Sequence, residues 1–241
     1  MATLKYQERF KTIKGVFDEF THRNIFELVS RNYFDEILRP LYIGKESNVF
    51  LAKKGQAVVI IKIYRLQNAD FMGMYNYIKQ DSRYEYLKKH RRDIIFAWTQ
   101  REYKNLIKAH EAKVRVPEPL AIMHNILIEE FIGDQENPAL RLKDLPPKNK
   151  KRFFADLLLQ IRQLYQAGLV HGDLSAFNIL NHNEKPVLID FSQGTTTNNP
   201  NHTELLKRDI KNILHFFAKL GIKANEEEIF KTITAKSNKK E

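Results

Sequence analysis

Four polar residues in the C-terminal half have types and spacing that suit phosphoryl transfer: His171, Asp173, Asn178 and Asp190. Asp173 and Asn178 stand five positions apart, and Asp190 ends the apolar run 187–189, which would place it at a strand end. Phosphoryl transfer depends mainly on positioning and on neutralising charge, and magnesium ions prefer carboxylate and amide oxygens. The pattern therefore predicts that Asp173 meets an incoming hydroxyl group while Asn178 and Asp190 hold magnesium.

Each half of this pattern is weak when taken alone. Asp173 and Asn178 are residue types that commonly satisfy the backbone of turns, and Asp190 could simply end a strand. His171 is expected to fix backbone geometry rather than to carry protons. The combination, placed after the amphipathic segment 148–167, favours a kinase-like phosphotransferase.

The N-terminal half offers a lysine and a loop that could bind phosphate groups. Lys62 lies in the apolar run 58–64, where a buried ammonium group needs an anion, although its side chain could instead reach solvent at a strand edge. Glu102, on the next predicted helix, is a candidate partner for Lys62, but exposure is the commoner outcome for such a glutamate. The loop 44–49 has only one glycine, yet its amides and the Ser47 hydroxyl group could hold phosphates.

The elements that must position these residues follow from hydrophobic spacing. Helical spacing is found at 11–38, 92–112, 148–167 and 205–220, and Asn225 is a good cap for a last helix. Strand-like runs are found at 41–51, 57–64, 120–123, 125–131, 169–180 and 185–191, the last two around loops. The segment 133–147 contains three prolines and is expected to be a loop or hinge. The order predicts a small β-rich lobe and a larger helical lobe, with a ligand between them.

Composition excludes several other classes of protein. The chain has 241 residues, 43% of them hydrophobic, so it can form a core, and it has no cysteine for disulfides or thiolate chemistry. No apolar run approaches the roughly 20 residues of a membrane-spanning helix, and no signal peptide is recognisable, so a cytoplasmic protein is expected. The net charge of +11 favours anionic partners, or serves only solubility.

Several short motifs occur in a fixed order along the chain, and together they are far more specific than any one of them. They are Gly44–Val49, Lys62–Tyr64, Met74–Ile78, Trp98 with Glu102–Leu106, Val116–Pro119, Glu130–Gly133, His171–Ser175, Asn178–Leu180 and Ile189–Gln193. With these motifs, from about residue 17 to residue 220, the chain resembles the RIO atypical kinases, and most closely their type 1 branch. Only 43 residues precede Gly44, too few for the winged-helix domain of the type 2 branch, and the compact length is similar to that of archaeal members.

The resemblance implies a bilobal protein-kinase-like fold of the α+β class, with a β-rich N-lobe and a reduced, mainly helical C-lobe. Only 51 residues follow Asp190 and no Ala-Pro-Glu motif occurs, so the usual subdomains for a peptide substrate are expected to be absent. Residues 1–40 are expected to form a helical extension that packs on the kinase core, 41–132 the N-lobe and 133–241 the truncated C-lobe. Residues 70–90 match a flexible loop of the family.

The resemblance also implies a site for ATP with magnesium, or with manganese in its place. Lys62 would contact the phosphates and pair with Glu102, and Asp173 would act as the catalytic base. Asp190 would hold the metal with Asn178 and would also accept phosphate, giving an aspartyl-phosphate. The further ATP-binding positions that it implies are Gly44, Lys45, Glu46, Ser47, Val49, Glu130, Ile132 and Leu180.

Two residues near the site depart from the pattern of the family. Glu129 stands where a methionine is usual beside the hinge 130–132, and this bears on how adenine packs. Phe191 follows Asp190 where a smaller apolar residue is common. Neither departure touches the groups expected to perform the chemistry.

The function implied by the resemblance is a serine/threonine protein kinase and ATPase in maturation of the small ribosomal subunit. Its expected partners are ATP, the small subunit with its RNA, and the chain itself as substrate, with no membrane and no DNA. One alternative is a kinase of the aminoglycoside or tRNA-modification type, which shares His-Gly-Asp-Leu, although Trp98 and the segment 74–78 favour the RIO interpretation. Another is a kinase-shaped RNA-binding module, since 88–92 and 148–152 are basic clusters, which could equally be ordinary surface.

Overall fold

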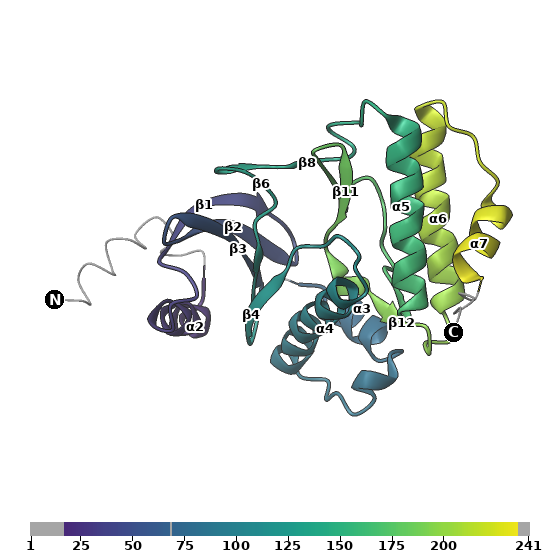
Figure 1. Cartoon of the computed structure of the whole chain (residues 1–241). Helices are drawn as coiled ribbons and strands as arrows, with labels where there is room; N and C mark the ends of the chain where they lie inside the picture. Colours follow the sequence, from purple (N-terminus) through teal and green to yellow (C-terminus); the bar gives the residue numbers. More distant parts are fainter. Residues whose placement is uncertain (1–16, 68, 236–241) are drawn as a thin grey trace, which may run out of the picture.

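The computed structural model describes residues 17–67 and 69–235, and it has a sheet on one side and long helices on the other (Figure 1). The sheet side and the helix side are called the β-rich lobe and the helical lobe below. This arrangement confirms the predicted α+β class and the kinase-like division into two lobes. Within the described residues, no helix is long and apolar enough to cross a bilayer.

The β-rich lobe is built on one antiparallel sheet of five strands in the order β1-β2-β3-β5-β4. The strands are β1 (Glu36–Ile43), β2 (Ser47–Lys54), β3 (Ala57–Tyr64), β4 (Pro119–Met123) and β5 (Ile126–Glu130). Side chains alternate between the faces of a sheet, so Ile61 and Ile63 point to one side and Lys62 to the other. On the first side, Ile61 and Ile63 pack with Ile25 and Leu28 of α2 (Glu19–Ser30).

The helix predicted at 11–38 is wrong at its C-terminal end, and its residues before 17 lie outside the described residues. The helix α2 begins after Asp18, whose carboxylate accepts a hydrogen bond from the backbone of Thr21 at 3.0 Å. It ends before Asn32, which has a left-handed φ of 59°, and β1 already begins at Glu36. Phe34 and Ile37 keep helix-like spacing by coincidence, because both are buried against the sheet rather than along a helix.

The strand-like run predicted at 41–51 is in fact parts of two strands, β1 and β2, joined by a tight turn. The Gly44 N–H donates to the Ser47 carbonyl oxygen at 2.9 Å and closes this turn. Two irregularities in the β1–β2 register interrupt the alternation of buried and exposed side chains in β1. The segment 133–147 is likewise more regular than a loop, with the short strands β6 (Gly133–Asp134), β7 (Asn137–Pro138) and β8 (Leu140–Arg141).

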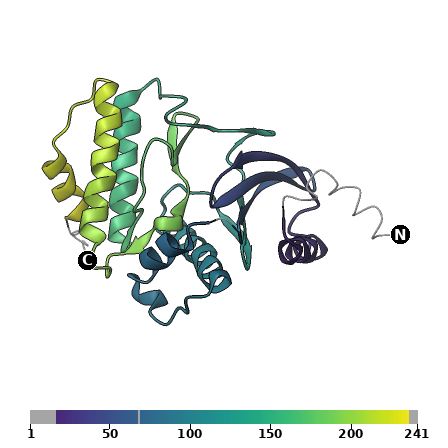
Figure 2. The same ribbon diagram turned by 180° about the vertical axis from the view of Figure 1, so that it is seen from behind.

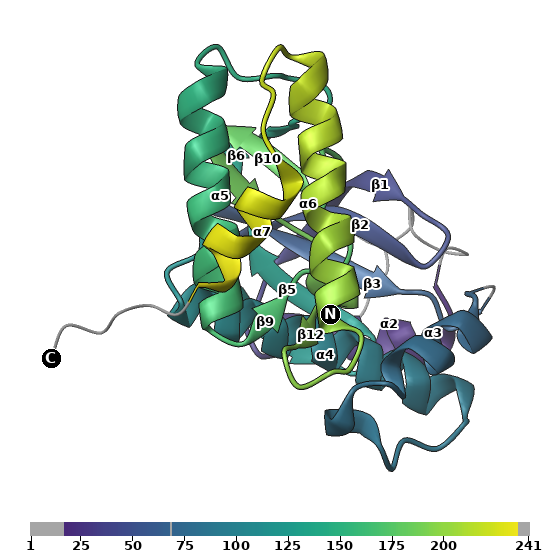
Figure 3. The same ribbon diagram turned by 90° about the vertical axis from the view of Figure 1, so that its right-hand side faces the viewer.

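The helical lobe is formed by three helices: α5 (Lys150–Gln166), α6 (His202–Lys219) and α7 (Glu226–Thr234). Figure 3 shows α5 and α6 side by side with α7 across them. Phe153 and Leu157 of α5 share a buried core with Ile210 and Phe217 of α6. The helices predicted at 148–167 and 205–220 are confirmed to within a few residues, and Asn225 caps α7 as expected.

Short strands at the inner edge of the helical lobe frame the residues singled out for chemistry. They are β9 (Leu169–Val170), β10 (Ile179–His182), β11 (Lys185–Leu188) and β12 (Thr195–Thr196). The loop 171–178 joins β9 to β10, and Asp190 follows β11 directly before the short helix η3 (Phe191–Gln193). The short strands predicted around loops at 169–180 and 185–191 are therefore confirmed.

The long helix α4 (Arg91–Glu111) lies between the lobes and touches both of them (Figures 1 and 2). Its prediction at 92–112 is confirmed within one residue at each end. The segment 70–90, expected as a flexible loop, contains α3 (Phe71–Ile78) and the short helix η2 (Ser82–Tyr84). Met74 and Ile78 are buried with Trp98 of α4, and this apolar contact holds α3 in place.

Replacing Leu28 by alanine should destabilise the β-rich lobe, because the Leu28 side chain is 1% exposed between α2 and the sheet. We expect a loss of about 2–5 kcal/mol in the free energy of unfolding, measured by urea denaturation. Glu27→Ala on the exposed face of α2 is the control, since its ion pair with Arg31 is exposed and should contribute less than about 1 kcal/mol. Equal losses in both variants would contradict the packing of α2 on the sheet.

Candidate active site

A cavity of about 410 Å³ lies between the two lobes and gathers most of the residues predicted for the site. From the β-rich lobe it is lined by Ser47, Val49, Ile60, Lys62, Glu129, Glu130 and Ile132, and from the helical lobe by Asn178, Leu180, Ile189 and Asp190. Glu102 and Asp173 are not part of this lining, but each is hydrogen-bonded to a residue that faces the cavity. Gly44, Lys45 and Glu46 form the turn between β1 and β2, outside the lining.

Lys62 is the centre of the site's electrostatics. Its side chain is buried, and its Nζ donates to Glu102 Oε1 at 2.7 Å and to Asp190 Oδ1 at 2.9 Å. The Tyr64 hydroxyl group donates to the other Glu102 oxygen. Burial alone would lower the pKa of Lys62, but Asp190 and Glu102 raise it well above its ordinary value. The ammonium group is therefore charged and turned inward, and Glu102 is buried rather than exposed on its helix.

Asp190 is held as an anion between Lys62 and the cavity. Burial would raise its pKa, but Lys62 and hydrogen bonding lower it to about 2. The side chain remains 41% exposed, so the carboxylate both binds Lys62 and faces the cavity. Its backbone has a left-handed φ of 63°, a conformation that costs free energy for a residue other than glycine.

The loop 171–178 brings Asp173 and Asn178 together. Asn178 Nδ2 donates to the Asp173 carbonyl oxygen at 2.8 Å and to its Oδ2 at 3.1 Å. Because the amide nitrogen is used in this way, the Asn178 side-chain oxygen is left for a ligand in the cavity. Burial raises the pKa of Asp173, and the nearby Asp190 adds to the effect, which makes Asp173 a better proton acceptor near neutral pH.

The donor set facing the cavity suits magnesium that is shared with a phosphate ligand. Among residues 17–67 and 69–235 there is no cluster of three or more acidic, histidine or cysteine side chains that could enclose a metal ion. Asp190 and Asn178 instead offer one carboxylate and one amide oxygen on the same cavity wall. Magnesium is commonly held by one or two carboxylates together with the phosphates of a substrate, so the residues present fit this ion.

His171 has the structural role expected of it. Its Nε2 lies 3.0 Å from the Ile189 carbonyl oxygen, and its Nδ1 lies 3.4 Å from the Asp173 backbone nitrogen. The ring also packs on Phe191, with 4.6 Å between the ring centres. Burial lowers the pKa of His171 to about 4, so the ring is neutral and links the loop to the residues before Asp190.

Asp209 of α6 is a positioning residue that the sequence interpretation missed. Its two carboxylate oxygens accept hydrogen bonds from the backbone N–H groups of Gly172 and Leu174, both at 2.8 Å. These bonds flank Asp173 and hold its loop against the helix. The available signal was position, because Asp209 stands three residues after Leu206 and one before Ile210 on the buried stripe of α6. A carboxylate in such a stripe needs partners.

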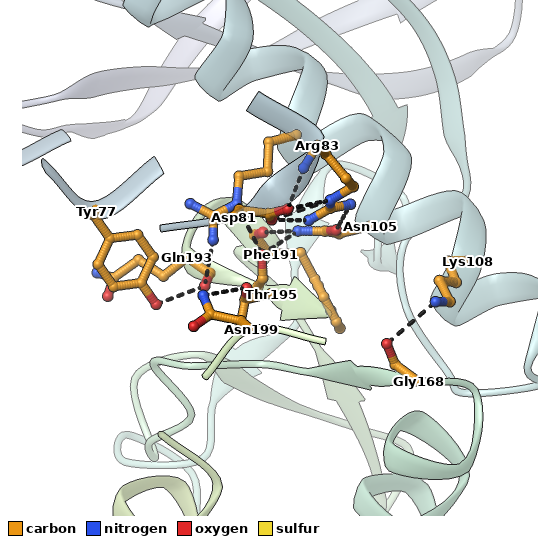
Figure 4. A network of polar contacts seen from close by, with 12 residues as sticks. Tyr77, Asp81, Arg83, Asn105, Lys108, Gly168, Phe191, Gln193, Thr195 and Asn199 are labelled. Carbon is orange, nitrogen blue, oxygen red and sulfur yellow. Dashed lines mark hydrogen bonds and ion pairs between the residues drawn. The ribbon is translucent and has the colours of Figure 1, made fainter. Parts of the chain in front are cut away.

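A second missed feature is the polar network that holds the chain after Asp190 (Figure 4). Asn105 Nδ2 of α4 donates to the Phe191 and Gly194 carbonyl oxygens at 3.0 and 2.7 Å. Arg101 Nε donates to the same Gly194 oxygen at 2.9 Å, and the Tyr77 hydroxyl group donates to the Gln193 carbonyl oxygen at 2.8 Å. These bonds join α3 and α4 to η3.

The network continues outward to the segment after α3. Arg83 Nη1 donates to Asn105 Oδ1 at 2.9 Å, and Arg83 also pairs with the fully buried Asp81. Burial would raise the pKa of Asp81, but its bonds with Arg83 lower it, so the pair is ionic. The segment 77–83 therefore orients Asn105, which in turn holds the backbone beyond Asp190.

Comparisons with known proteins match the chain over most of its length. A family model described as "RIO domain" matches residues 48–229. The "RIO-type serine/threonine-protein kinase Rio1" of Haloferax volcanii is 37% identical over 232 residues, which are 96% of this chain and 80% of that protein. The protein of the same name from Methanocaldococcus jannaschii is 37% identical over 233 residues, with the same coverage.

Human and structural relatives agree with these matches. The human "Serine/threonine-protein kinase RIO1" is 30% identical over 241 residues, which are 97% of this chain and 42% of the human protein. Among solved structures, the "Rio2 kinase-ADP/Mg2+-phosphoaspartate complex" from Chaetomium thermophilum superposes with a TM-score of 0.67 at 21% identity. That superposition covers 89% of this chain and 66% of the other, and it supports the fold.

Stability should depend on pH through His171, because burial lowers its pKa from 6.5 to about 4 in the folded state. The stabilisation is complete above about pH 6.5, where the unfolded chain is also neutral, and is lost as the pH falls toward the folded value. The loss between about pH 6.5 and about pH 5 should be about 2 kcal/mol.

Urea unfolding of the wild type and of His171→Gln at both pH values measures this effect. Glutamine cannot titrate, so the free-energy difference between the two proteins should shrink by that amount at the lower pH. A difference of the same size at both pH values would mean that the folded protein binds the proton as readily as the unfolded chain does.

Proposed function

Since this chain belongs to the RIO family, in its type 1 branch, we propose that it is a serine/threonine kinase that binds ATP between its lobes. The observation that carries the proposal is the buried Lys62, whose ammonium group joins Glu102 to Asp190 at the wall of the cavity. Such a cation, charged and fixed beside an open cavity, is placed to bind phosphate oxygens. The names of the relatives support a serine or threonine hydroxyl group as the acceptor.

The apolar part of the cavity suits the base of the nucleotide. Val49 and Ile60 line it from the β-rich lobe, and Leu180 and Ile189 line it from the helical lobe. The Ile132 N–H has no acceptor among the described residues and is available to a ligand, while the Ile132 carbonyl oxygen accepts from Ala139. We assign the phosphates to the side of Ser47 and Lys62, with the turn formed by Gly44, Lys45 and Glu46 above them.

In the proposed reaction, Asp173 accepts the proton of the attacking hydroxyl group as that oxygen bonds to the γ-phosphorus atom and ADP leaves. Its raised pKa and its hydrogen bond from Asn178 suit this role. Asn178 and Asp190 would hold magnesium or manganese, and the metal ion would supply charge neutralisation at the phosphates. Lys62 holds Asp190 in position and adds a second positive charge.

We further propose an ATPase cycle in which an Asp190 oxygen attacks the γ-phosphorus atom and ADP leaves. Water then cleaves the aspartyl-phosphate and releases inorganic phosphate. Two properties of Asp190 support this step: the low pKa keeps the carboxylate ionised, and its partial exposure leaves it accessible. The Rio2 kinase of Chaetomium thermophilum, which shares this fold, was solved as a phosphoaspartate complex.

A role in small-subunit maturation, with contact to ribosomal RNA, is a second proposal, and one structural observation favours it. Lys150, Lys151 and Arg152 are all exposed in the first turn of α5, which contains no acidic residue. The N-terminal end of a helix carries partial positive charge, so cations there repel it and one another. The Glu184 carboxylate accepts hydrogen bonds from the Lys148 and Asn149 N–H groups at this end, but a single carboxylate offsets only part of three positive charges. An RNA backbone is an anion that would offset the rest.

Several finer points belong to the same proposal. We retain the division into an extension (1–40), an N-lobe (41–132) and a truncated C-lobe (133–241), with β1 starting inside the first segment. A cytoplasmic location, phosphorylation of the chain itself and the lack of a role at DNA or membranes also remain proposals. The aminoglycoside-type and tRNA-modification alternatives are set aside, because the chain belongs to the RIO family.

Replacing the two aspartates should separate binding from chemistry. We expect Asp190→Ala to abolish ATP turnover and any acid-labile phosphoenzyme, and Asp173→Ala to bind nucleotide but to turn over about 10²- to 10⁴-fold more slowly. Turnover is measured by release of labelled phosphate, and binding by calorimetry. Asp134→Ala, at a side chain that is 83% exposed, should behave as the wild type. Normal turnover in both test variants would refute the assigned roles.

Reversing the basic turn of α5 should weaken RNA binding and its dependence on salt. The variant Lys150→Glu, Lys151→Glu, Arg152→Glu removes three cations that could each neutralise one phosphate. The slope of log K against log salt concentration should fall by about 2 to 3. Fluorescence anisotropy with a labelled fragment of small-subunit ribosomal RNA measures it. Lys53→Glu, Lys54→Glu, at the exposed end of β2, is the control. An unchanged slope in the α5 variant would remove RNA as a partner of this surface.

A further inference from the structure

We propose that Glu129 determines which base the cavity accepts, selecting adenine against guanine through a hydrogen bond from the exocyclic amino group of adenine to its carboxyl group. This inference rests on the proposed function, in that the cavity is taken to bind a nucleoside triphosphate. It concerns a residue that has no part in the phosphoryl chemistry described above.

The register of the sheet places Glu129 on the cavity side. Glu129 of β5 pairs with Ile60 of β3, and Leu127 pairs with Lys62. Directly paired residues of antiparallel strands point to the same face, so Glu129, Ile60 and Lys62 share one face of the sheet. All three line the cavity. The intervening Ile128 points to the opposite face and packs in the core beneath α2.

The carboxyl group of Glu129 has no hydrogen-bond donor among the described residues. Lys62 lies on the same face of the sheet, but its ammonium group donates to Glu102 and Asp190 and not to Glu129. On the cavity side the neighbours include the apolar Val49 and Ile60. A carboxyl group in such surroundings costs free energy unless a donor reaches it. A bound base with an amino group would provide that donor.

The backbone next to Glu129 completes a pattern that matches adenine. Glu130 N–H donates to the Glu118 carbonyl oxygen at 2.8 Å, whereas the Ile132 N–H has no acceptor among residues 17–67 and 69–235. The hinge thus presents one free donor at Ile132 and one acceptor at Glu129. Adenine offers the complement, with an acceptor at ring nitrogen N1 beside the donor at N6. Guanine reverses both groups, with a donor at N1 and an acceptor at O6.

The charged groups around Glu129 add a dependence on pH. Burial raises its pKa to about 8, with Glu102 on α4, Asp190 and Glu130 adding to the effect and Lys62 opposing it. With this pKa most of the Glu129 carboxyl groups are protonated near neutral pH, and a protonated carboxyl group can donate to O6 of guanine as well as accept from N6 of adenine. Discrimination between the bases should therefore increase as the pH rises through about 8.

The test compares kcat/KM for ATP and for GTP in the wild type, Glu129→Gln and Glu129→Met, together with the affinities for ADP and GDP by calorimetry. An amide can donate as well as accept, and a thioether does neither, so both changes should lower the preference for adenine by about tenfold or more. Glu118→Gln, at an exposed carboxylate outside the cavity lining, is the control for loss of a nearby negative charge.

Each outcome is informative about Glu129. A preference for adenine that is unchanged in both variants, while the wild type turns over ATP, would overturn this inference and leave the proposed function intact. A wild type that binds neither nucleotide would refute both. If the variants fail to fold, the wild type alone provides the test. A ratio of kcat/KM for ATP to kcat/KM for GTP that does not change between about pH 7 and about pH 9 would also overturn the inference.

Discussion

The burial of one ammonium group is the constraint on which the site depends. Lys62 lies in the central strand β3, and its charge is tolerable there only because Glu102 and Asp190 both accept hydrogen bonds from it. These partners come from a helix and from the loop after β11, so the ion pairs join the two lobes. Removing either carboxylate would leave Lys62 with a single anionic partner, which is why both must be held firmly.

The helix α4 holds both anionic partners of Lys62 in place. One part of its surface presents Glu102 to Lys62, while Arg101 and Asn105 hold the carbonyl groups of the segment after Asp190. Neighbouring residues of one rigid helix thus fix both partners of the lysine. The left-handed backbone of Asp190 is explained by this arrangement, since the hydrogen bonds that follow it stabilise a conformation that would otherwise be unfavourable. In the same way, Asp209 of α6 accepts backbone hydrogen bonds that stabilise the loop containing Asp173.

The sequence predicted the residues of the site better than it predicted the side chains that hold those residues in position. Lys62 and Asp190 could be found because each interrupts or ends an apolar run. Their supports are backbone hydrogen bonds from side chains such as Asn105, which look like ordinary helix residues until the fold brings distant loops to them. The beginning of the strand β1 was assigned to the preceding helix for a related reason, because its irregular register removes the alternation that identifies a strand. The long helices were found readily, since their apolar stripes are regular over many turns.

The charges around the cavity oppose the charge of the whole chain. The chain carries a net +11, which attracts anions from a distance, yet Lys62 is surrounded by the carboxyl groups of Glu102, Asp190 and Glu129. Asp173 adds a further one beyond Asn178. A triphosphate that enters therefore meets more carboxyl groups than ammonium groups, and the balance must be restored by cations that the protein does not itself supply. A divalent metal bound by Asn178 and Asp190 would meet that need, and the raised pKa of Glu129 reduces it by keeping one carboxyl group mostly neutral near pH 7. Nucleotide binding in such a site should then be coupled to the metal ion more than to the overall basic charge.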